Sequence, residues 1–167
     1  MQQINFPTKN KNMKISEEKH YINSIYYKIE QTAKYCKYLG TQVFQRLNMP
    51  MSLEEFAALD TISLYKEICQ RDLAKLILKD RPSTGRILNS LEEEGYITRF
   101  VDTKNNRLVR KMSLTEEGHK VLNKVSSVIR EYMNNLPDFL SQEDIKSLEL
   151  SIQKFRQGLE KEVEMNI

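Results

Sequence analysis

Residues 81–89 bring guanidinium, hydroxyl and carboxamide side chains together at the start of a predicted helix. These groups form hydrogen bonds with phosphate oxygens and with the edges of bases. The chemistry that they suggest is recognition of duplex DNA in its major groove. The alternative is that the hydroxyl groups only cap the helix and that the arginines lie in solvent. The candidate residues are Arg81, Ser83, Thr84, Arg86 and Asn89.

A second basic group follows between positions 104 and 111, where a hairpin is predicted. Its tip and second strand carry Lys104, Arg107, Arg110 and Lys111. Like charges at this density repel one another, so a nearby anion would relieve the repulsion. Residues 81–115 hold 7 basic and 4 acidic residues, whereas the whole chain has a net charge of only +3. We therefore expect Lys104 and Arg107 to contact phosphates, with a hairpin exposed to solvent as the alternative.

The elements that would position these side chains follow from local signals. Pro82 suits a first helical turn and Gly95 suits a helix end, and apolar residues between them can form one buried side. A shorter helix is predicted at 70–78, and Lys79-Asp80 connects it to the helix that starts at Arg81. After Gly95, β-branched and aromatic residues flank an Asp/Asn-rich turn, which indicates a hairpin. The order is that of a winged helix-turn-helix.

Four motifs in this region resemble the MarR (multiple antibiotic resistance regulator) family of bacterial transcription regulators. They are Gln70-Arg71-Asp72-Leu73-Ala74-Lys75, Leu91-Glu92-Glu93-Glu94-Gly95-Tyr96-Ile97, the wing from Asp102 to Arg107, and Leu114-Thr115-Glu116-Glu117-Gly118. The resemblance implies a homodimeric, sequence-specific DNA-binding regulator, more often a repressor than an activator. The wing departs from the family pattern, because two asparagines precede a lone Arg107, which the resemblance places in the minor groove.

Long helices with apolar stripes are predicted at both ends of the chain. Residues 17–47 and 116–167 repeat apolar side chains at spacings of three, four and seven, around a winged helix-turn-helix at 48–115. A small core cannot cover these stripes, so we expect a second chain to cover them. In the family that the chain resembles, these helices form the dimer. A bundle within one chain is the alternative. The fold class is mainly α (α+β), and the lysine-rich residues 1–16 are predicted to be a flexible arm.

Other classes of function find little support in the composition. His20 and His119 are the only histidines, Cys36 and Cys69 the only cysteines, and no glycine-rich phosphate loop occurs. We therefore expect no enzyme, no metal and no cofactor. The absence of a long apolar stretch, of a signal-peptide core and of a disulfide pattern predicts a cytoplasmic protein that does not enter a membrane.

Regulation is predicted mainly from the resemblance. Members of the family respond to small phenolic or lipophilic ligands, or to oxidation of a cysteine. Cys69 stands where the first helix of the helix-turn-helix should be capped, near Lys66 and Arg71. Cys36 lies on the apolar stripe, which predicts that it is buried, and it stands between Tyr35 and Tyr38. These tyrosines could line a pocket with Phe56 and Leu59. The alternatives are an unreactive thiol in a weak cap and tyrosines that pack in the dimer.

The sequence thus predicts a regulator that binds a pseudo-palindromic operator in double-stranded DNA as a homodimer, with relief by a ligand or by oxidation. A winged helix used only for protein contacts, without a discrete operator, is the alternative.

Overall fold

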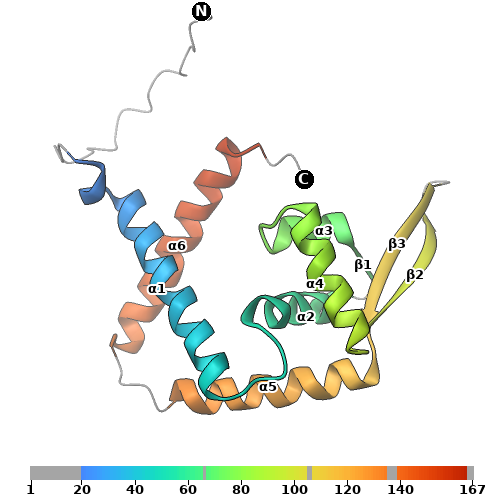
Figure 1. The fold of residues 1–167 in the computed structure, drawn as a ribbon. Helices are drawn as coiled ribbons and strands as arrows, with labels where there is room; N and C mark the ends of the chain where they lie inside the picture. The colour runs from blue at the N-terminus through green and yellow to red at the C-terminus, as the bar shows by residue number, and fades with distance from the viewer. Residues whose placement is uncertain (1–19, 66, 105–106, 135–138, 165–167) are drawn as a thin grey trace, which may run out of the picture. The chain divides into compact units, whose positions relative to one another are not determined.

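The computed structural model describes residues 20–65, 67–104, 107–134 and 139–164; the side chains of Lys104 and Arg107 are not among the parts described. The predicted arm at 1–16 lies outside these residues. The helices and strands, shown in Figure 1, are η1 (Tyr21–Asn23), α1 (Ile25–Arg46), α2 (Leu53–Leu64), β1 (Ile68–Cys69), α3 (Gln70–Leu76), α4 (Arg81–Glu93), β2 (Ile97–Lys104), β3 (Arg107–Leu114), α5 (Glu116–Asn134) and α6 (Gln142–Glu162).

The chain divides into two compact units, Met1–Arg46 and Leu47–Ile167. In the first unit, the long helix α1 begins at Ile25, later than the predicted start at residue 17. Ser24 is extended, with φ −68° and ψ 153°, and its hydroxyl accepts a hydrogen bond from the Tyr27 N–H at 3.3 Å. This local cap ends the preceding 3₁₀ turn and starts α1 afresh. The three-part domain division stays a prediction.

Helices α3 and α4 form the helix-turn-helix of the second unit, and α2 packs against both of them. Helix α2 starts with the predicted capping box, in which the Ser52 hydroxyl accepts from the Glu55 N–H and the Glu55 carboxylate accepts from the Ser52 N–H. Helix α3 ends at Leu76, two residues before the predicted end, because Leu78 takes a left-handed φ of 52°. The connection to α4 is therefore slightly longer than predicted.

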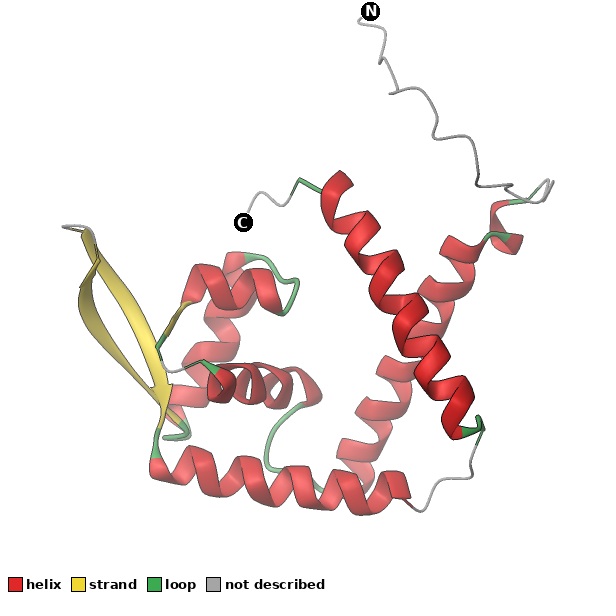
Figure 2. Cartoon of the chain, turned by 180° about the vertical axis from the view of Figure 1, so that it is seen from behind, coloured by secondary structure: helices red, strands yellow, loops and turns green. Residues whose placement is uncertain are grey.

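Three antiparallel strands form a small sheet in the order β1-β3-β2. The hairpin of β2 and β3 was predicted, and Figure 2 shows it as the long pair of strands. Strand β1 was not predicted, because two residues are too short to show a periodicity. It pairs Ile68 with Met112 and Cys69 with Lys111, and so ties the start of α3 to the wing.

The core of this unit lies between the helix-turn-helix, the sheet and the first half of α5. Its most buried side chains come from all three parts, and α5 packs against α2 and β3. The apolar face predicted for α4 is confirmed, since Ile87, Leu88 and Leu91 are all buried. The largest fully buried side chains are Leu59, Ile62, Leu73, Leu88, Leu91, Met112, Val125 and Thr84.

Two glycines fix the junction between α4, the hairpin and α5. Gly95 has φ +73°, as expected just after a helix, and the Tyr96 N–H closes the helix end on the Leu91 carbonyl at 2.9 Å. Gly118 lies so close to the hairpin that a Cβ there would stand 2.0 Å from the Tyr96 carbonyl oxygen. Thr115 caps α5 as predicted, because its hydroxyl accepts from the Gly118 N–H at 2.9 Å and donates to the Gly95 carbonyl at 2.7 Å.

The two terminal helices leave much apolar surface uncovered in the single chain. Helix α6 starts at the capping box of Ser141 and Asp144, yet it has no buried residue, and its Ile152 is 50% exposed. On α1, Tyr35 and Tyr38 are 75% and 66% exposed. None of the described helices is long and apolar enough to cross a membrane.

Candidate nucleic-acid interface

The start of α4 is fixed by Asp80. Its carboxylate accepts hydrogen bonds from the Ser83 N–H at 2.7 Å and from the Ser83 hydroxyl at 3.0 Å. These bonds, the backbone one foremost, hold the pKa of Asp80 below its ordinary value. Pro82 occupies the first turn, where its missing N–H costs nothing. The helix therefore begins at Arg81 with a capped first turn, and the exposed Arg81 and Pro82 leave its positive dipole end open to solvent.

Thr84 does not belong to the contact surface that the sequence suggested. Its side chain is 0% exposed, and its hydroxyl donates to the Asp80 carbonyl at 2.9 Å. At 100° per residue, Thr84 falls among Ile87, Leu88 and Leu91 on the buried side of the helix. Thr84 therefore stabilises the first turn of α4 and cannot reach a base.

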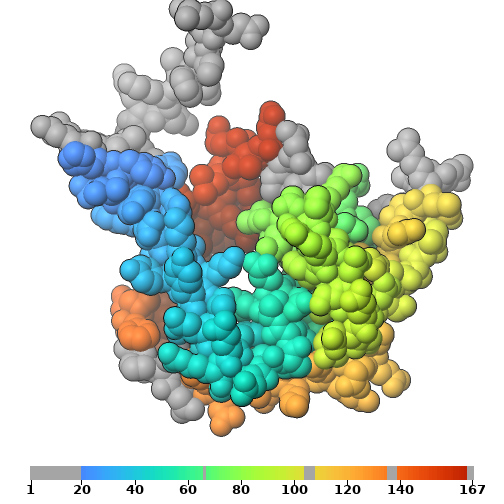
Figure 3. Space-filling model, viewed as in Figure 1, coloured from blue at the N-terminus to red at the C-terminus, as the bar shows by residue number. Residues whose placement is uncertain are grey.

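The opposite side of α4 is open to solvent, and Figure 3 shows it on the surface beside the hairpin. Arg81, Arg86 and Asn89 are exposed, and Ser83 is half-buried. One Arg86 amino group, Nη2, donates to the Ser83 hydroxyl at 3.1 Å, which places the guanidinium over the first turn. These are the side chains with which α4 can contact a ligand. Their contact with DNA stays a prediction.

A residue that sequence reasoning missed connects this surface to the wing. Arg99 of β2 donates from Nε to the Glu92 carboxylate at 2.9 Å and from Nη2 to Asn89 Oδ1 at 2.9 Å. The hydrogen bond to Glu92 raises the pKa of Arg99, and the same bond lowers the pKa of Glu92. The available signal was an arginine between Thr98 and Phe100, in the first half of a strand whose other charged residues, Asp102 and Lys104, lie near its end.

Lys111, counted in the basic group at 104–111, has a structural role. Its ammonium pairs with the Glu67 carboxylate at 2.7 Å and with Asp102, and its side chain is only 17% exposed. These two bonds, the one to Asp102 foremost, raise the pKa of Lys111. The ammonium therefore joins β3 to β2 and to the residue before β1.

The two wing residues in the predicted contact set lie at the end of the hairpin. Lys104 and Arg107 form the last backbone pair of β2 and β3. Their side chains lie outside the described part of the structure, so their contacts stay a prediction. Arg110, three residues further along β3, is exposed.

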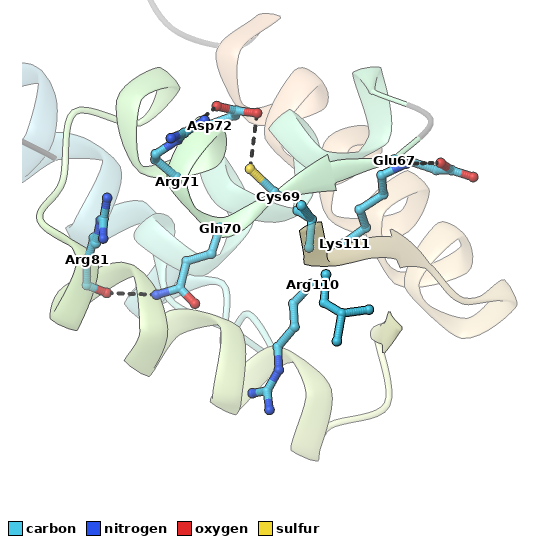
Figure 4. A pocket seen from close by; sticks show the side chains of 10 residues that line it. Glu67, Cys69, Gln70, Arg71, Asp72, Arg81, Arg110 and Lys111 are labelled. Atoms are coloured by element: carbon cyan, nitrogen blue, oxygen red, sulfur yellow. Dashed lines mark hydrogen bonds and ion pairs between the residues drawn. The ribbon is translucent and has the colours of Figure 1, made fainter. Parts of the chain in front are cut away.

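A groove of about 930 Å³ separates the start of α3 and the start of α4 from β3 (Figure 4). At one side of the groove, the Gln70 side chain donates to the Arg81 carbonyl at 3.1 Å and so holds α3 and α4 together. Four basic and two acidic side chains line the groove, which leaves it with a net charge of +2. The lining residues are Glu67, Cys69, Gln70, Arg71, Asp72, Arg81, Leu108, Val109, Arg110 and Lys111.

Cys69 caps α3 as predicted, but its thiol makes no cap hydrogen bond. Instead Sγ donates to Asp72 Oδ2 at 3.1 Å (Figure 4). The charged group that the thiol contacts is thus a carboxylate, whereas its sequence neighbours suggested a basic setting; of these neighbours, Lys66 lies outside the described residues. Arg71 itself faces Asp72, with Nε 3.8 Å from Oδ1.

The other predicted sensing residues include Cys36, Tyr35 and Tyr38 on α1 and Leu59 on α2. Cys36 is exposed, although its place on the apolar stripe predicted burial. Leu59 is fully buried in the core and offers no surface to a ligand. A pocket that includes Tyr35 and Tyr38 stays a prediction. The described residues contain no group of three or more histidine, cysteine, aspartate or glutamate side chains placed to hold a metal ion.

Comparison with known proteins agrees with this geometry. The MarR family model matches residues 51–109. The structure of the transcriptional regulator SlyA is similar, with a TM-score of 0.68 and 22% identity over 83% of this chain and 95% of that one. The S. aureus MepR-DNA complex has a TM-score of 0.65 and 21% identity over 84% and 99%. A cysteine-to-serine mutant of E. coli MarR has a TM-score of 0.65 and 19% identity over 81% and 98%. The MarR family model thus matches residues 51–109, and the chain shares the winged-helix fold of the SlyA, MarR and MepR structures.

Proposed function

We propose that this protein is a transcription regulator that binds double-stranded DNA as a homodimer and recognises a pseudo-palindromic operator. The observation that carries the proposal is the open side of α4. Arg86 and Asn89 point away from a core that holds the helix by Leu88 and Leu91, while Asp80 caps its first turn. A rigid helix with such side chains on its outer face suits the major groove.

The charges around α4 support contacts with phosphates. The groove beside it has a net charge of +2, and Arg110 is exposed at its edge. The positive end of the α4 dipole lies at the same place. Basic side chains and helix N-termini are the groups that position a protein on the DNA backbone. We assign this role to Arg81, Arg110 and the wing residues Lys104 and Arg107.

The exposed apolar side chains of the terminal helices support the homodimer. Ile25 and Leu39 on α1 and Leu148 and Ile152 on α6 are all at least 40% exposed. Burial of such side chains is worth about 25 cal/mol per Å² of apolar surface, which favours a partner. In a two-fold dimer, the two α4 helices would meet half-sites about one DNA turn apart. The similar MepR protein of S. aureus was crystallised with DNA.

We further propose repression as the mode of action, with relief by a small phenolic or lipophilic ligand or by cysteine oxidation. Either signal would act by shifting the population between dimers that fit the operator and dimers that do not. Cys69 is the better placed of the two cysteines, because it lies at the start of α3 and in the groove beside α4. No enzymatic activity is part of this proposal.

Two alanine variants test the assignments on α4 and the wing. Arg86→Ala should weaken operator binding by ~1–3 kcal/mol and relax the sequence preference, as expected for a contact with a base edge. Arg107→Ala should weaken binding to all sequences alike, as expected for a backbone contact. Titrations of operator and random duplexes by gel shift measure both effects. Arg130→Ala on the exposed side of α5 is the matched control and should bind as the parent does. Parent-like binding by both test variants would overturn the assignments.

A further inference from the structure

Arg99 fixes the orientation of the Asn89 side chain. One guanidinium group contacts Asn89 and Glu92 of α4 at the same time, at 2.9 Å in each case. A guanidinium has only donors, so the Asn89 atom that faces it must be the oxygen, Oδ1. The amide nitrogen of Asn89, with both of its N–H groups, is therefore directed away from Arg99.

The guanidinium is itself held from two sides. Its positive charge forms an ion pair with the Glu92 carboxylate, and the Arg99 side chain is only 24% exposed. On the sheet, Arg99 pairs with Met112, which is 1% exposed and belongs to the core. Arg99 thus projects from the firmly packed end of the hairpin, far from its tip. An arginine placed in this way can hold a neighbour in one orientation.

The fixed amide has a consequence for base recognition. An asparagine that reads adenine uses both of its groups, since Oδ1 accepts from N6 and Nδ2 donates to N7. Although Oδ1 has a second lone pair, an adenine N6 donor would have to approach beside the donors of Arg99. A guanine edge offers two acceptors, N7 and O6, which suit the two N–H groups that remain.

We propose that Arg99 is a positioning residue that makes Asn89 a hydrogen-bond donor only, and thereby commits α4 to guanine at the base pair that Asn89 contacts. This inference rests on the proposed function. Arg99 itself does not contact DNA in this proposal.

Selection of binding sites from random duplex DNA tests the inference with four proteins: the parent, Asn89→Ala, Arg99→Met and the double variant. Asn89→Ala identifies the base pair, because only there should the preference disappear. The parent should prefer guanine over adenine at this pair by about tenfold, within the range of a good base contact. Arg99→Met frees Oδ1, so the preference should shift to adenine. The double variant should match Asn89→Ala, and the positions that depend on Arg86 should not change.

Two results would overturn the inference: adenine preferred by the parent at that pair, or an unchanged guanine preference in Arg99→Met, even with weaker overall binding. A purely structural role for Arg99 predicts the second result. If Arg99→Met does not fold, Arg99→Gln offers Asn89 both a donor and an acceptor, so it no longer forces Oδ1 to face it, and the preference for guanine over adenine should fall. An unchanged preference overturns the inference equally. If the parent enriches no site at all, the proposed function fails first.

Discussion

The close approach between α5 and the hairpin makes Gly118→Ala a sharp test of the fold. A Cβ at this position would lie 2.0 Å from the Tyr96 carbonyl oxygen, whereas such contacts normally measure about 3.3 Å or more. The oxygen cannot retreat easily, because it accepts a hydrogen bond from the Thr115 N–H at 3.0 Å. The hairpin must therefore move by about 1 Å relative to α5.

The size of the effect follows from two opposing terms. Overpacking against fixed groups costs ~1–3 kcal/mol, and occasionally more, whereas alanine favours a helix over glycine by ~1 kcal/mol. Because the obstacle here is backbone, we expect the upper part of the first range and a net loss of about 2 kcal/mol. For a chain of this size, that corresponds to a fall in Tm of about 4–8 °C, measured by thermal denaturation followed by circular dichroism.

Gly158→Ala is the matched control for this prediction. Gly158 also lies within a helix, α6, but a Cβ there would meet no atom within 4 Å. It stands about a quarter turn away from the apolar stripe of α6, so the proposed dimer should accept a methyl group. The control variant should melt at or slightly above the parent temperature. A Gly118→Ala protein that melts as high as the Gly158→Ala protein would refute the reasoning about the junction.

Three further predictions concern α4 and α3. The pKa of Asp80 is lowered in the folded protein, so the ionised carboxylate stabilises the fold fully above its ordinary pKa of 3.8, and this stabilisation is lost as the pH falls through the lower folded pKa. The parent should therefore lose stability in acid more steeply than Asp80→Asn. Equal dependence of Tm on pH in the two proteins would contradict this. Thr84→Val removes a buried hydrogen bond and should lower the free energy of unfolding by about 1 kcal/mol without changing the base preference of the selected site. A changed preference would mean that Thr84 contacts DNA after all. If oxidation of Cys69 loosens α3, peroxide should weaken DNA binding by the parent but not by Cys69→Ser. An equal loss of DNA affinity in both proteins would rule out Cys69 as the oxidation sensor.

The elements predicted best from the sequence are those set by local signals. Ser52 and Ser141 mark helix starts by their own capping chemistry, and Leu88 and Leu91 reveal the buried side of α4 by their spacing. Thr84 was misassigned because a hydroxyl at a helix start suits both a cap and a DNA contact. Only its angular position among buried leucines separates the two roles.

Contacts between elements were harder to predict. Arg99 meets its partners on α4 across the turn at Gly95, and no spacing rule connects a strand residue with two positions on a preceding helix. Strand β1 exists only because its two residues pair with β3. The predicted burial of Cys36 rested on an apolar stripe that the single chain leaves uncovered.

Site selection by the unmodified chain, followed by counting the chains bound per duplex, tests the central proposal most directly. We expect an enriched site with two-fold symmetry, half-site centres about 10 base pairs apart, and two chains on each duplex. Binding that is weak, sensitive to salt and indifferent to sequence would contradict it and favour a winged helix that serves protein contacts.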